Sequence, residues 1–209
     1  MAIWCVGSIN IDHFYSVPHI PAPGETLAAA SVASGLGGKG ANQSVAAAKA
    51  GSTVRHIGAT GADGAWVVER LTAYGVDTSR VDQTKPVTAH AIISVADDGE
   101  NAIVIFSAAN RSLDEGRIAE YMSKAEAGDI LLLQNETNAQ AAAARAAKSA
   151  GMRVFYSAAP FDVEAVRQVA AFIDVLIVNE IEQEQLEATL PDLVVPERLV
   201  TLGSKGAVW

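Results

Sequence analysis

Short, continuously apolar segments alternate with helix-like segments along most of this 209-residue chain. The strand-like segments are residues 3–9, 54–57, 130–133, 154–156, 175–178 and 199–202. Helices are predicted at residues 43–50, 66–74, 138–150 and 163–172; the first three are followed by a glycine and the last is preceded by Asp162, a typical N-cap. Apolar strands that alternate with helices are typical of a parallel sheet covered on both faces. We therefore predict an α/β fold with a Rossmann-like, mostly parallel sheet flanked by helices.

Two stretches do not follow this alternation. Residues 89–95 and 102–106 flank the sequence Asp-Asp-Gly-Glu-Asn and predict a β-hairpin around an Asp-Gly turn. Residues 13–34 contain three prolines and then a segment that tolerates the β conformation. Neither stretch fits a strand–helix–strand unit, so we expect both to form a small accessory sheet over the main one.

Charge and cysteine content exclude several classes of partner. The chain has 15 Lys and Arg against 24 Asp and Glu, a formal charge of −9, which is poorly suited to binding nucleic acid or an anionic membrane. No apolar run reaches the ~18–20 residues of a membrane span, and the first residues lack a basic targeting segment. Cys5 is the only cysteine, which fits a reducing compartment. We expect a cytoplasmic protein.

Polar or glycine-rich residues follow five of the predicted strands. They lie at residues 10–12, 58–61, 134–136, 179–182 and 201–206. In parallel sheets, ligands bind outside the carboxyl ends of the strands. Helix caps and turns place the same residue types there, but five such positions together predict a small-molecule site.

A glycine-rich segment at residues 35–42 precedes the helix expected from Gln43. Its lysine is followed by glycine, so it is not a Walker A loop. The G-x-G-x-x-G spacing of dinucleotide-binding loops is present at Gly35, Gly37 and Gly40, but the segment does not directly follow the first strand. A third interpretation is a loop that binds a polar ligand through backbone N–H groups together with Lys39 and Asn42.

The run Gly-Gly-Lys-Gly-Ala-Asn-Gln at residues 37–43 resembles the N-terminal signature of the ribokinase family of carbohydrate kinases. The resemblance extends in order along the chain. It includes the opening Gly-Ser-Ile-Asn-Ile-Asp at 7–12, Gly-Glu-Thr at 24–26, the strand ending in Gln-Asn-Glu at 134–136, Asn-Glu-Ile-Glu at 179–182 and Thr-Leu-Gly-Ser-Lys-Gly at 201–206.

The resemblance implies roles for individual residues. Those implied to contact a sugar are Asn10, Asp12, Gly38, Lys39, Asn42 and Glu136. Those implied to border the nucleotide are Asn179, Thr201, Gly203 and Lys205. Glu182 is implied to act near a magnesium ion through a bound water.

The implied activity is transfer of the ATP γ-phosphate to the 5-hydroxyl of a pentose, with D-ribose favoured. ATP and Mg²⁺ are the implied cofactors, and a monovalent cation such as K⁺ is a further candidate. The resemblance also implies that lid strands within about 11–34 and 88–107 close over the sugar and pair two subunits into a homodimer. The other hypotheses are a related sugar or nucleoside kinase, and a non-catalytic sugar-binding fragment or pseudokinase.

The sequence departs from the family pattern at several places. Ser-Ala-Ala-Pro at 157–160 stands where Asn-Pro-Ala-Pro is usual, and Ala-Ala-Asn at 108–110 where Gly-Ala-Asn is usual. The stretch between Glu182 and Thr201 is shorter than expected. The family's Gly-Ala-Gly-Asp motif, with its general-base aspartate, is expected beyond Trp209, so the 209-residue chain alone, residues 1–209, is expected to be inactive. Asp162, Asp174 and Asp192 are interpreted as caps or surface residues, not as substitutes for this base.

Overall fold

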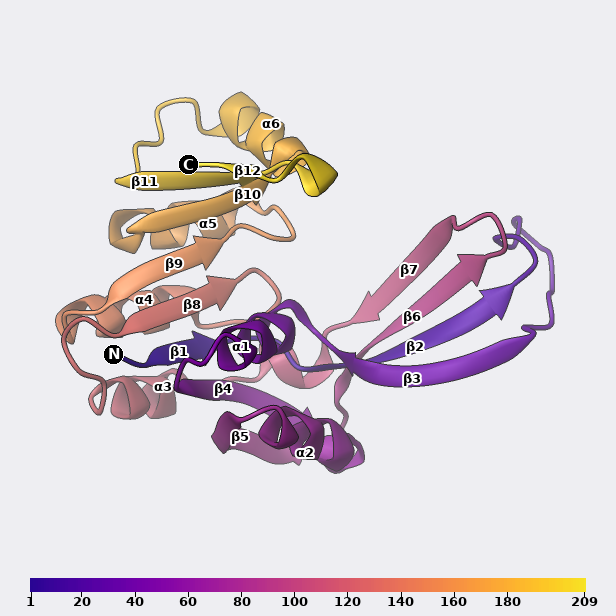
Figure 1. Cartoon of the computed structure of the whole chain (residues 1–209), viewed down its shortest axis with the longest axis horizontal. Coiled ribbons are helices and arrows are strands. Elements are labelled where there is room, and N and C mark those ends of the chain that lie inside the picture. Colours follow the sequence, from indigo (N-terminus) through magenta and orange to yellow (C-terminus); the bar gives the residue numbers. More distant parts are fainter.

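The computed structural model describes residues 1–209, which form two β-sheets (Figure 1). The larger sheet has eight strands, in the spatial order β12 (Ala207–Val208), β11 (Glu197–Thr201), β10 (Val175–Asn179), β9 (Arg153–Ser157), β8 (Ile130–Gln134), β1 (Ile3–Val6), β4 (Val54–Gly61) and β5 (Val76–Lys85). All neighbouring strands are parallel except β12, which is antiparallel to β11. The predicted α/β fold with a mostly parallel sheet is confirmed.

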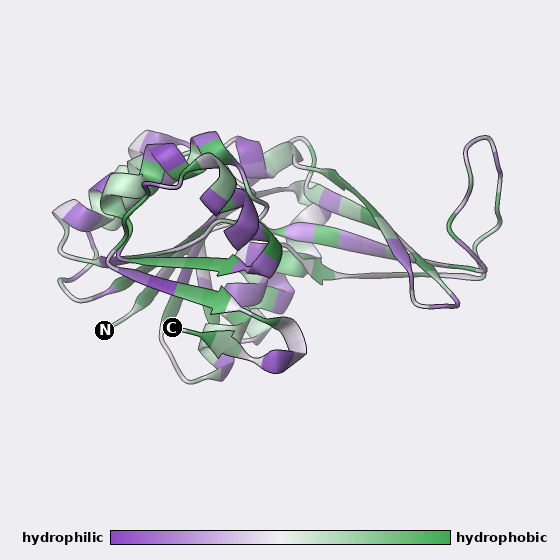
Figure 2. Ribbon diagram, turned by 90° about the horizontal axis from the view of Figure 1, so that it is seen from above, coloured by the Kyte–Doolittle hydropathy of each residue, from purple (hydrophilic) through white to green (hydrophobic).

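The second sheet, called the small sheet below, has four strands. Their order is β3 (Ser31–Gly37), β2 (Asn10–Val17), β6 (Ala89–Ala96) and β7 (Asn101–Phe106). Strands β2 and β6 are parallel, and the two outer pairs are antiparallel. The predicted hairpin is present as β6 and β7, with Gly99 at a φ of +89° in its turn. The small sheet projects beside the main sheet as an arm and does not lie over its face (Figures 1 and 2).

Six α-helices and four short 3-10 helices connect the strands. They are α1 (Lys39–Lys49), η1 (Ala62–Gly64), α2 (Ala65–Ala73), η2 (Ala108–Arg111), α3 (Glu115–Met122), α4 (Gln140–Ser149), α5 (Val163–Val169), η3 (Ala170–Phe172), α6 (Glu180–Thr189) and η4 (Gly203–Lys205). Helices α1 and α2 contribute to the smaller of two apolar clusters, and α3 to α6 contribute to the larger. No helix in the structure combines the length and the apolar character needed to span a bilayer.

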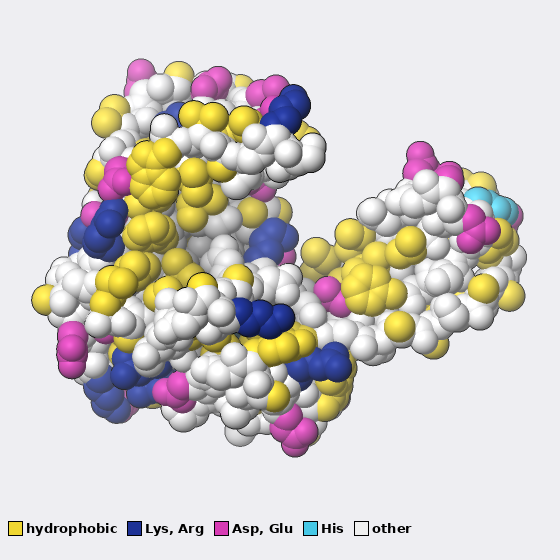
Figure 3. Space-filling view, in the orientation of Figure 1, with side chains coloured by type: hydrophobic (Ala, Val, Ile, Leu, Met, Phe, Trp, Pro, Cys, Tyr) yellow, Lys and Arg dark blue, Asp and Glu magenta, His cyan; other side chains and the backbone are white.

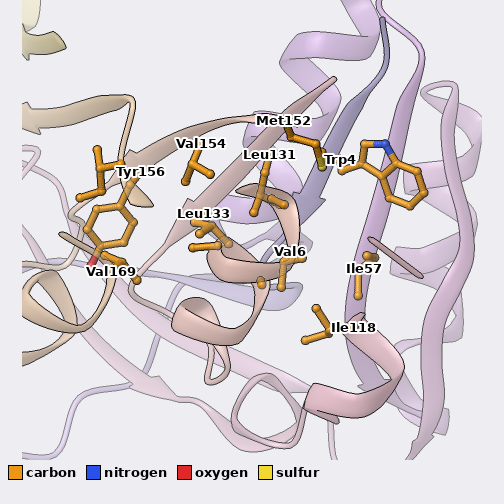
Figure 4. Packing of buried hydrophobic residues seen from close by; sticks show 14 of the residues in the cluster. Trp4, Val6, Ile57, Ile118, Leu131, Leu133, Met152, Val154, Tyr156 and Val169 are labelled. Carbon is orange, nitrogen blue, oxygen red and sulfur yellow. The ribbon is translucent and has the colours of Figure 1, made fainter. Parts of the chain in front are cut away.

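The larger apolar cluster is the main core and contains 24 buried residues (Figure 4). Alternate residues of neighbouring strands meet in it, for example Trp4 and Val6 of β1 with Leu131 and Leu133 of β8. Burying each such side chain stabilises the fold by roughly 1.5–3 kcal/mol. The indole N–H of Trp4 is also satisfied, since it donates to Asp129 at 3.0 Å. This core holds the central strands, and hence their carboxyl ends, in place.

Several predicted boundaries differ from the structure. Strand β1 ends at Val6, so Asn10 belongs to the small sheet, and β4 continues through the glycine-containing residues 58–61. Strand β5 and helix α3 were not predicted. In β5 only Val76 and Val81 are buried, because β5 lies at the sheet edge and its other residues are partly or fully exposed. A strand with so few apolar residues has no clear hydrophobic period.

Candidate functional site

The carboxyl ends of β1 and β8 lie side by side at the centre of the main sheet. On one side of β1 lie β4 and β5, and on the other side lie β8, β9 and β10, so the order in which the strands are added reverses at β1. Such a switch point in an α/β sheet opens a crevice for ligands. Glu136, one of the predicted strand-end residues, follows β8, and its carboxylate is hydrogen-bonded to Ser8, which follows β1.

The glycine-rich segment is not the loop that we expected. Gly35 and Gly37 belong to β3, and α1 begins at Lys39 and not at Gln43. Gly38 alone separates strand from helix; its φ is +94°, and a Cβ there would lie 2.8 Å from the Ser8 carbonyl oxygen. A Cβ on Gly40 would lie 2.5 Å from the Gly7 Cα. These glycines therefore allow the start of α1 to approach the end of β1, where the sequence analysis predicted a ligand-binding loop.

Lys39 and Glu136 form the polar centre of the site. The Lys39 ammonium donates to Glu136 Oε1 at 2.8 Å, and the Lys39 backbone N–H donates to Oε2 at 2.9 Å. The Ser8 hydroxyl also donates to Oε2, at 2.5 Å. Burial by itself raises the pKa of Glu136, but the hydrogen bonds from Lys39 and Ser8 outweigh it, and the pKa is lowered overall. Glu136 is therefore held as a carboxylate.

Asp12 has a different environment from Glu136. Burial, and then the nearby negative charge of Glu136, raise the pKa of Asp12. Its Oδ1 atom is buried and has no hydrogen-bond partner in the protein. The carboxyl group lies against the backbone of Gly37, where any side chain would collide with it. An acceptor atom without a donor is costly in a folded protein, so this oxygen is available to a ligand hydroxyl.

Two hollows flank the Lys39–Glu136 ion pair. The smaller has a volume of about 150 Å³ and is lined by Asn10, Ile105, Ser107, Asn110, Arg111, Asn135, Glu136 and Pro160. The larger has a volume of about 360 Å³ and is lined by Lys39, Asn42, Gln43, Ser157, Ala159, Ile177, Val178, Asn179, Glu182 and Thr201. In the surface view the molecule is hollowed between the main sheet and the small sheet (Figure 3).

The hollows bring together most, but not all, of the predicted site residues. Asn10 and Glu136 line the smaller one; Lys39, Asn42, Asn179, Glu182 and Thr201 line the larger one. Four predicted residues line neither hollow: Asp12, Gly38, Gly203 and Lys205. Gly203 and Lys205 lie on the exposed η4 beyond β11. Asn110 and Arg111 were not predicted as site residues; the only signal was the Ala-Ala-Asn departure at 108–110.

The Asn-x-x-Glu motif has a clear structural role. The Asn179 side chain accepts from the Glu182 N–H at 2.8 Å, and Glu182 Oε2 accepts from the Asn179 N–H at 2.9 Å. This capping box starts helix α6 at the edge of the larger hollow. Glu182 Oε1 has no partner in the protein.

The structure contains no group of three or more His, Cys, Asp or Glu side chains that could hold a metal ion. Glu182 is the one carboxylate that lines the larger hollow. Mg²⁺ is commonly held by one or two carboxylates together with substrate phosphates and water, so Glu182 fits a magnesium ion that arrives with a nucleotide. Asp162 caps α5 and Asp174 pairs with Lys148 at 2.8 Å, which confirms their interpretation as structural residues.

Two buried titratable residues near the site, His56 and Cys5, have hydrogen-bond partners and are structural. His56 lies between the Ser44 hydroxyl, at 2.8 Å, and the Gly7 carbonyl oxygen, at 3.1 Å. Burial lowers the pKa of His56 to about 4, so its ring is neutral at pH 7. Burial likewise raises the pKa of the neighbouring Cys5 thiol to about 11. Neither group is suited to acid–base or nucleophilic chemistry near neutral pH.

Comparison with known proteins agrees with this geometry. Residues 2–209 match the family described as pfkB family carbohydrate kinase. Ribokinase from Haemophilus influenzae is 34% identical over 220 residues, which cover 96% of this chain and 72% of the relative. Deoxyribokinase from Salmonella typhi is 32% identical over 232 residues, which cover 100% of this chain and 74% of the relative.

Solved structures give the same result. The structure of Arabidopsis thaliana ribokinase complexed with ribose and ATP matches with a TM-score of 0.85 and 31% identity, covering 99% of this chain and 74% of that one. Family match, sequence identity and fold therefore agree over nearly the whole of residues 1–209. The chain belongs to the pfkB family of carbohydrate kinases.

Proposed function

We propose that this protein transfers the γ-phosphate of ATP to the 5-hydroxyl of a pentose, with D-ribose as the favoured acceptor. The observation that carries the proposal is the placement of two hollows of different size on either side of one ion pair. Glu136 lines the smaller hollow, Lys39 lines the larger, and their charged groups are 2.8 Å apart. A sugar and a nucleotide bound there would lie next to each other, as phosphoryl transfer requires.

The smaller hollow supports a sugar because its lining is polar. Asn10, Asn110, Asn135 and Glu136 offer both donors and acceptors. Asp12 does not line this hollow, but its Oδ1 is unpartnered, and Asp12 is near enough to Glu136 for that charge to raise its pKa. A carboxylate can accept from two neighbouring hydroxyls at once. We propose that Asp12 and Glu136 hold sugar hydroxyls, with Gly38, Lys39 and Asn42 contacting the sugar from the start of α1.

The larger hollow supports the nucleotide. We assign its phosphates to the region of Asn179 and Glu182, and we propose that Thr201, Gly203 and Lys205 border the nucleotide. Glu182 would hold Mg²⁺ through a water, and the ion would supply charge neutralisation of the phosphates. By analogy with the family we also propose K⁺ as an activator. No residue of this chain is assigned as the general base.

The small sheet is proposed to act as a lid and as a dimer surface. Its strand β7 leaves Ile103, Val104, Ile105 and Phe106 exposed by 51–68%. Apolar strands of this kind are typical of surfaces that become covered. Closure over the sugar would exclude water that competes as phosphoryl acceptor. We also propose a cytoplasmic location, which the single unpaired Cys5 supports.

The decisive experiment gives the purified protein D-ribose, ATP and Mg²⁺ and measures ribose 5-phosphate by mass spectrometry and ribose binding by calorimetry. Turnover together with ribose binding supports the kinase. Ribose binding without turnover supports sugar recognition by residues 1–209 and leaves the chemistry unassigned. The absence of both binding and turnover would overturn the ribose proposal. 2-Deoxyribose and a nucleoside serve as competing acceptors, because relatives include a deoxyribokinase.

A matched pair of variants tests the assignment of Asp12. Asp12→Asn should weaken ribose binding about tenfold or more, since a charge-assisted acceptor is replaced by an amide. Asp98→Asn removes a carboxylate from the hairpin turn of the same sheet, where Asp98 only accepts from the Glu100 N–H. It should leave ribose binding unchanged. Equal effects of the two variants would contradict the role of Asp12.

A further inference from the structure

Asn110 forms a buried hydrogen-bonded link between the backbone and Asn10. It lies on η2, directly after the small-sheet strand β7, and is 2% exposed. Its Oδ1 accepts from the Ile9 N–H at 3.0 Å, and its Nδ2 donates to Asn10 Oδ1 at 2.8 Å. Asn10 is 4% exposed and lines the smaller hollow. The side-chain amides of Asn110 and Asn10 thus form a chain of hydrogen bonds from the Ile9 N–H to the hollow.

The Ile9 N–H determines which way both amides point. A backbone N–H can only donate, so the Asn110 atom that faces it must be the carbonyl oxygen. The Asn110 NH₂ group then faces Asn10, where only the acceptor Oδ1 can meet it. The Asn10 NH₂ group is left without a partner in the protein, on a residue that lines the hollow.

We propose that Asn110 is a positioning residue that makes Asn10 a hydrogen-bond donor toward the acceptor sugar. The sugar in this inference rests on the proposed function, whereas the orientation of the Asn10 amide does not. A sugar hydroxyl both donates and accepts. The carboxylates of Asp12 and Glu136 accept hydrogen bonds from sugar hydroxyls. The Asn10 NH₂ group would donate to a hydroxyl oxygen, so the site would offer the sugar both acceptors and a donor.

The segment that carries Asn110 is itself anchored. The next residue, Arg111, donates to the Thr137 carbonyl oxygen at 2.8 Å and to the Asn135 carbonyl oxygen at 3.3 Å. These acceptors lie just after β8, at the edge of the same hollow. Asn110 is therefore fixed to the main sheet even though its chain segment comes directly from the small sheet.

The orientation can be tested without any sugar. Asn110→Asp keeps an acceptor for the Ile9 N–H but removes the donor to Asn10, so the Asn10 amide should turn and donate to the new carboxylate. With ¹⁵N-labelled asparagine, the Asn10 side-chain NH₂ signal at pH 8 should move downfield and exchange more slowly in N110D. An unchanged Asn10 signal would overturn the inference. If N110D does not fold, Asn110→Ser, which can still accept from Ile9, is measured in the same way and should change the same signal.

Ribose binding by calorimetry tests the consequence. N110D should weaken D-ribose binding about tenfold or more, as expected for a lost donor opposite a bound polar group. The double variant N10A/N110D should bind no more weakly than N10A alone, because no amide remains to be oriented. Additive losses would mean that Asn110 acts only on the fold, which would overturn the positioning role.

A matched control separates stability from positioning. Asn138 is likewise fixed by the backbone, with hydrogen bonds of 2.9 Å to both the N–H and the carbonyl oxygen of Leu113, and it does not line the smaller hollow. N138D should lower the melting temperature but leave ribose affinity within about twofold. If the Asn10 amide turns in N110D while the wild type binds no ribose, the positioning role stands and the ribose function fails.

Discussion

Strand β8 of the main sheet and strand β7 of the small sheet use the same kinds of side chain in opposite environments. Leu131 and Leu133 in β8 are 0% exposed, whereas Val104 and Ile105 in β7 are 68% and 51% exposed. The surface view shows apolar side chains gathered on the small sheet (Figure 3). Since only buried apolar surface contributes to folding, β8 stabilises the protein and β7 adds little. The exposed apolar residues of β7 are available for closure and pairing, as proposed above.

The largest effect is expected in the main core. Leu131→Ala should reduce the free energy of unfolding by about 2–5 kcal/mol, because it leaves a cavity among fully buried side chains. Urea denaturation measures this loss. Val104→Ala is the control in the small sheet and should cost well under 1 kcal/mol. A large loss at Val104 would show that this residue is already covered in the isolated protein, which would contradict the comparison.

A second test uses the buried His56 beneath the main sheet's carboxyl edge. Its folded-state pKa is lowered from 6.5 to about 4, so the unfolded chain takes up the proton first. Neutral His56 therefore causes no loss of stability above pH 6.5. As the pH drops toward 4, the free energy of unfolding falls by up to ~3 kcal/mol because of this residue. His56→Gln should remove this acid loss in urea titrations at several pH values. His13→Gln, in the small sheet, leaves His56 in place and should retain it.

The ion pair where the two hollows meet should give a smaller effect. Glu136→Gln leaves the Lys39 ammonium without its carboxylate and should lower the free energy of unfolding by about 1–3 kcal/mol at pH 7. Because the pKa of Glu136 is lowered by folding, its contribution is present above the unfolded value near 4.3 and is lost as the pH falls below it. Glu120→Gln, in an exposed pair with Lys124, is the control. If both variants lowered the free energy of unfolding equally, the Lys39–Glu136 pair would contribute no more than an exposed surface pair.

The smallest effect concerns the connection between the two sheets. Ala108 has a φ of +32°, a value that residues with a side chain rarely adopt. Ala108→Gly should raise the free energy of unfolding by up to about 1 kcal/mol, since the relief of strain exceeds the entropic cost of glycine. Ala109→Gly, whose residue is 3% exposed, should instead destabilise the protein. A thermal scan distinguishes the two; a loss at both positions would contradict strain at Ala108.

The sequence predicted the elements that have a strong local signal. The apolar runs of β8, β9 and β10 and the alanine-rich α4 appear close to their predicted positions. The start of α1 was wrong because residues 35–42 were taken as a loop, whereas Gly40 permits close contact of α1 with Gly7. The end of the first strand was also wrong, since the strand predicted over 3–9 ends at Val6. Strand β5 was missed because an edge strand with polar residues has little hydrophobic period.

For the site, the sequence predicted which residues carry the chemistry but not all of their partners. Asn10, Glu136, Lys39 and Asn179 were predicted and line the two hollows. Asn110 was not, because a single asparagine after a strand carries no local signal for a contact with a residue 100 positions earlier. Its role depends on where η2 lies relative to Asn10, which only the packing of the two sheets establishes.

The sequence by itself determined the local features of this protein: the alternation of strands and helices, the hairpin turn at Gly99, and the Asp162 cap of α5. Each follows from the properties of residues a few positions apart. The tertiary structure alone decided the strand order, the 2.8 Å ion pair of Lys39 with Glu136 and the orientation of Asn10. These join residues about 100 positions apart, and no local pattern encodes which distant strand ends will meet.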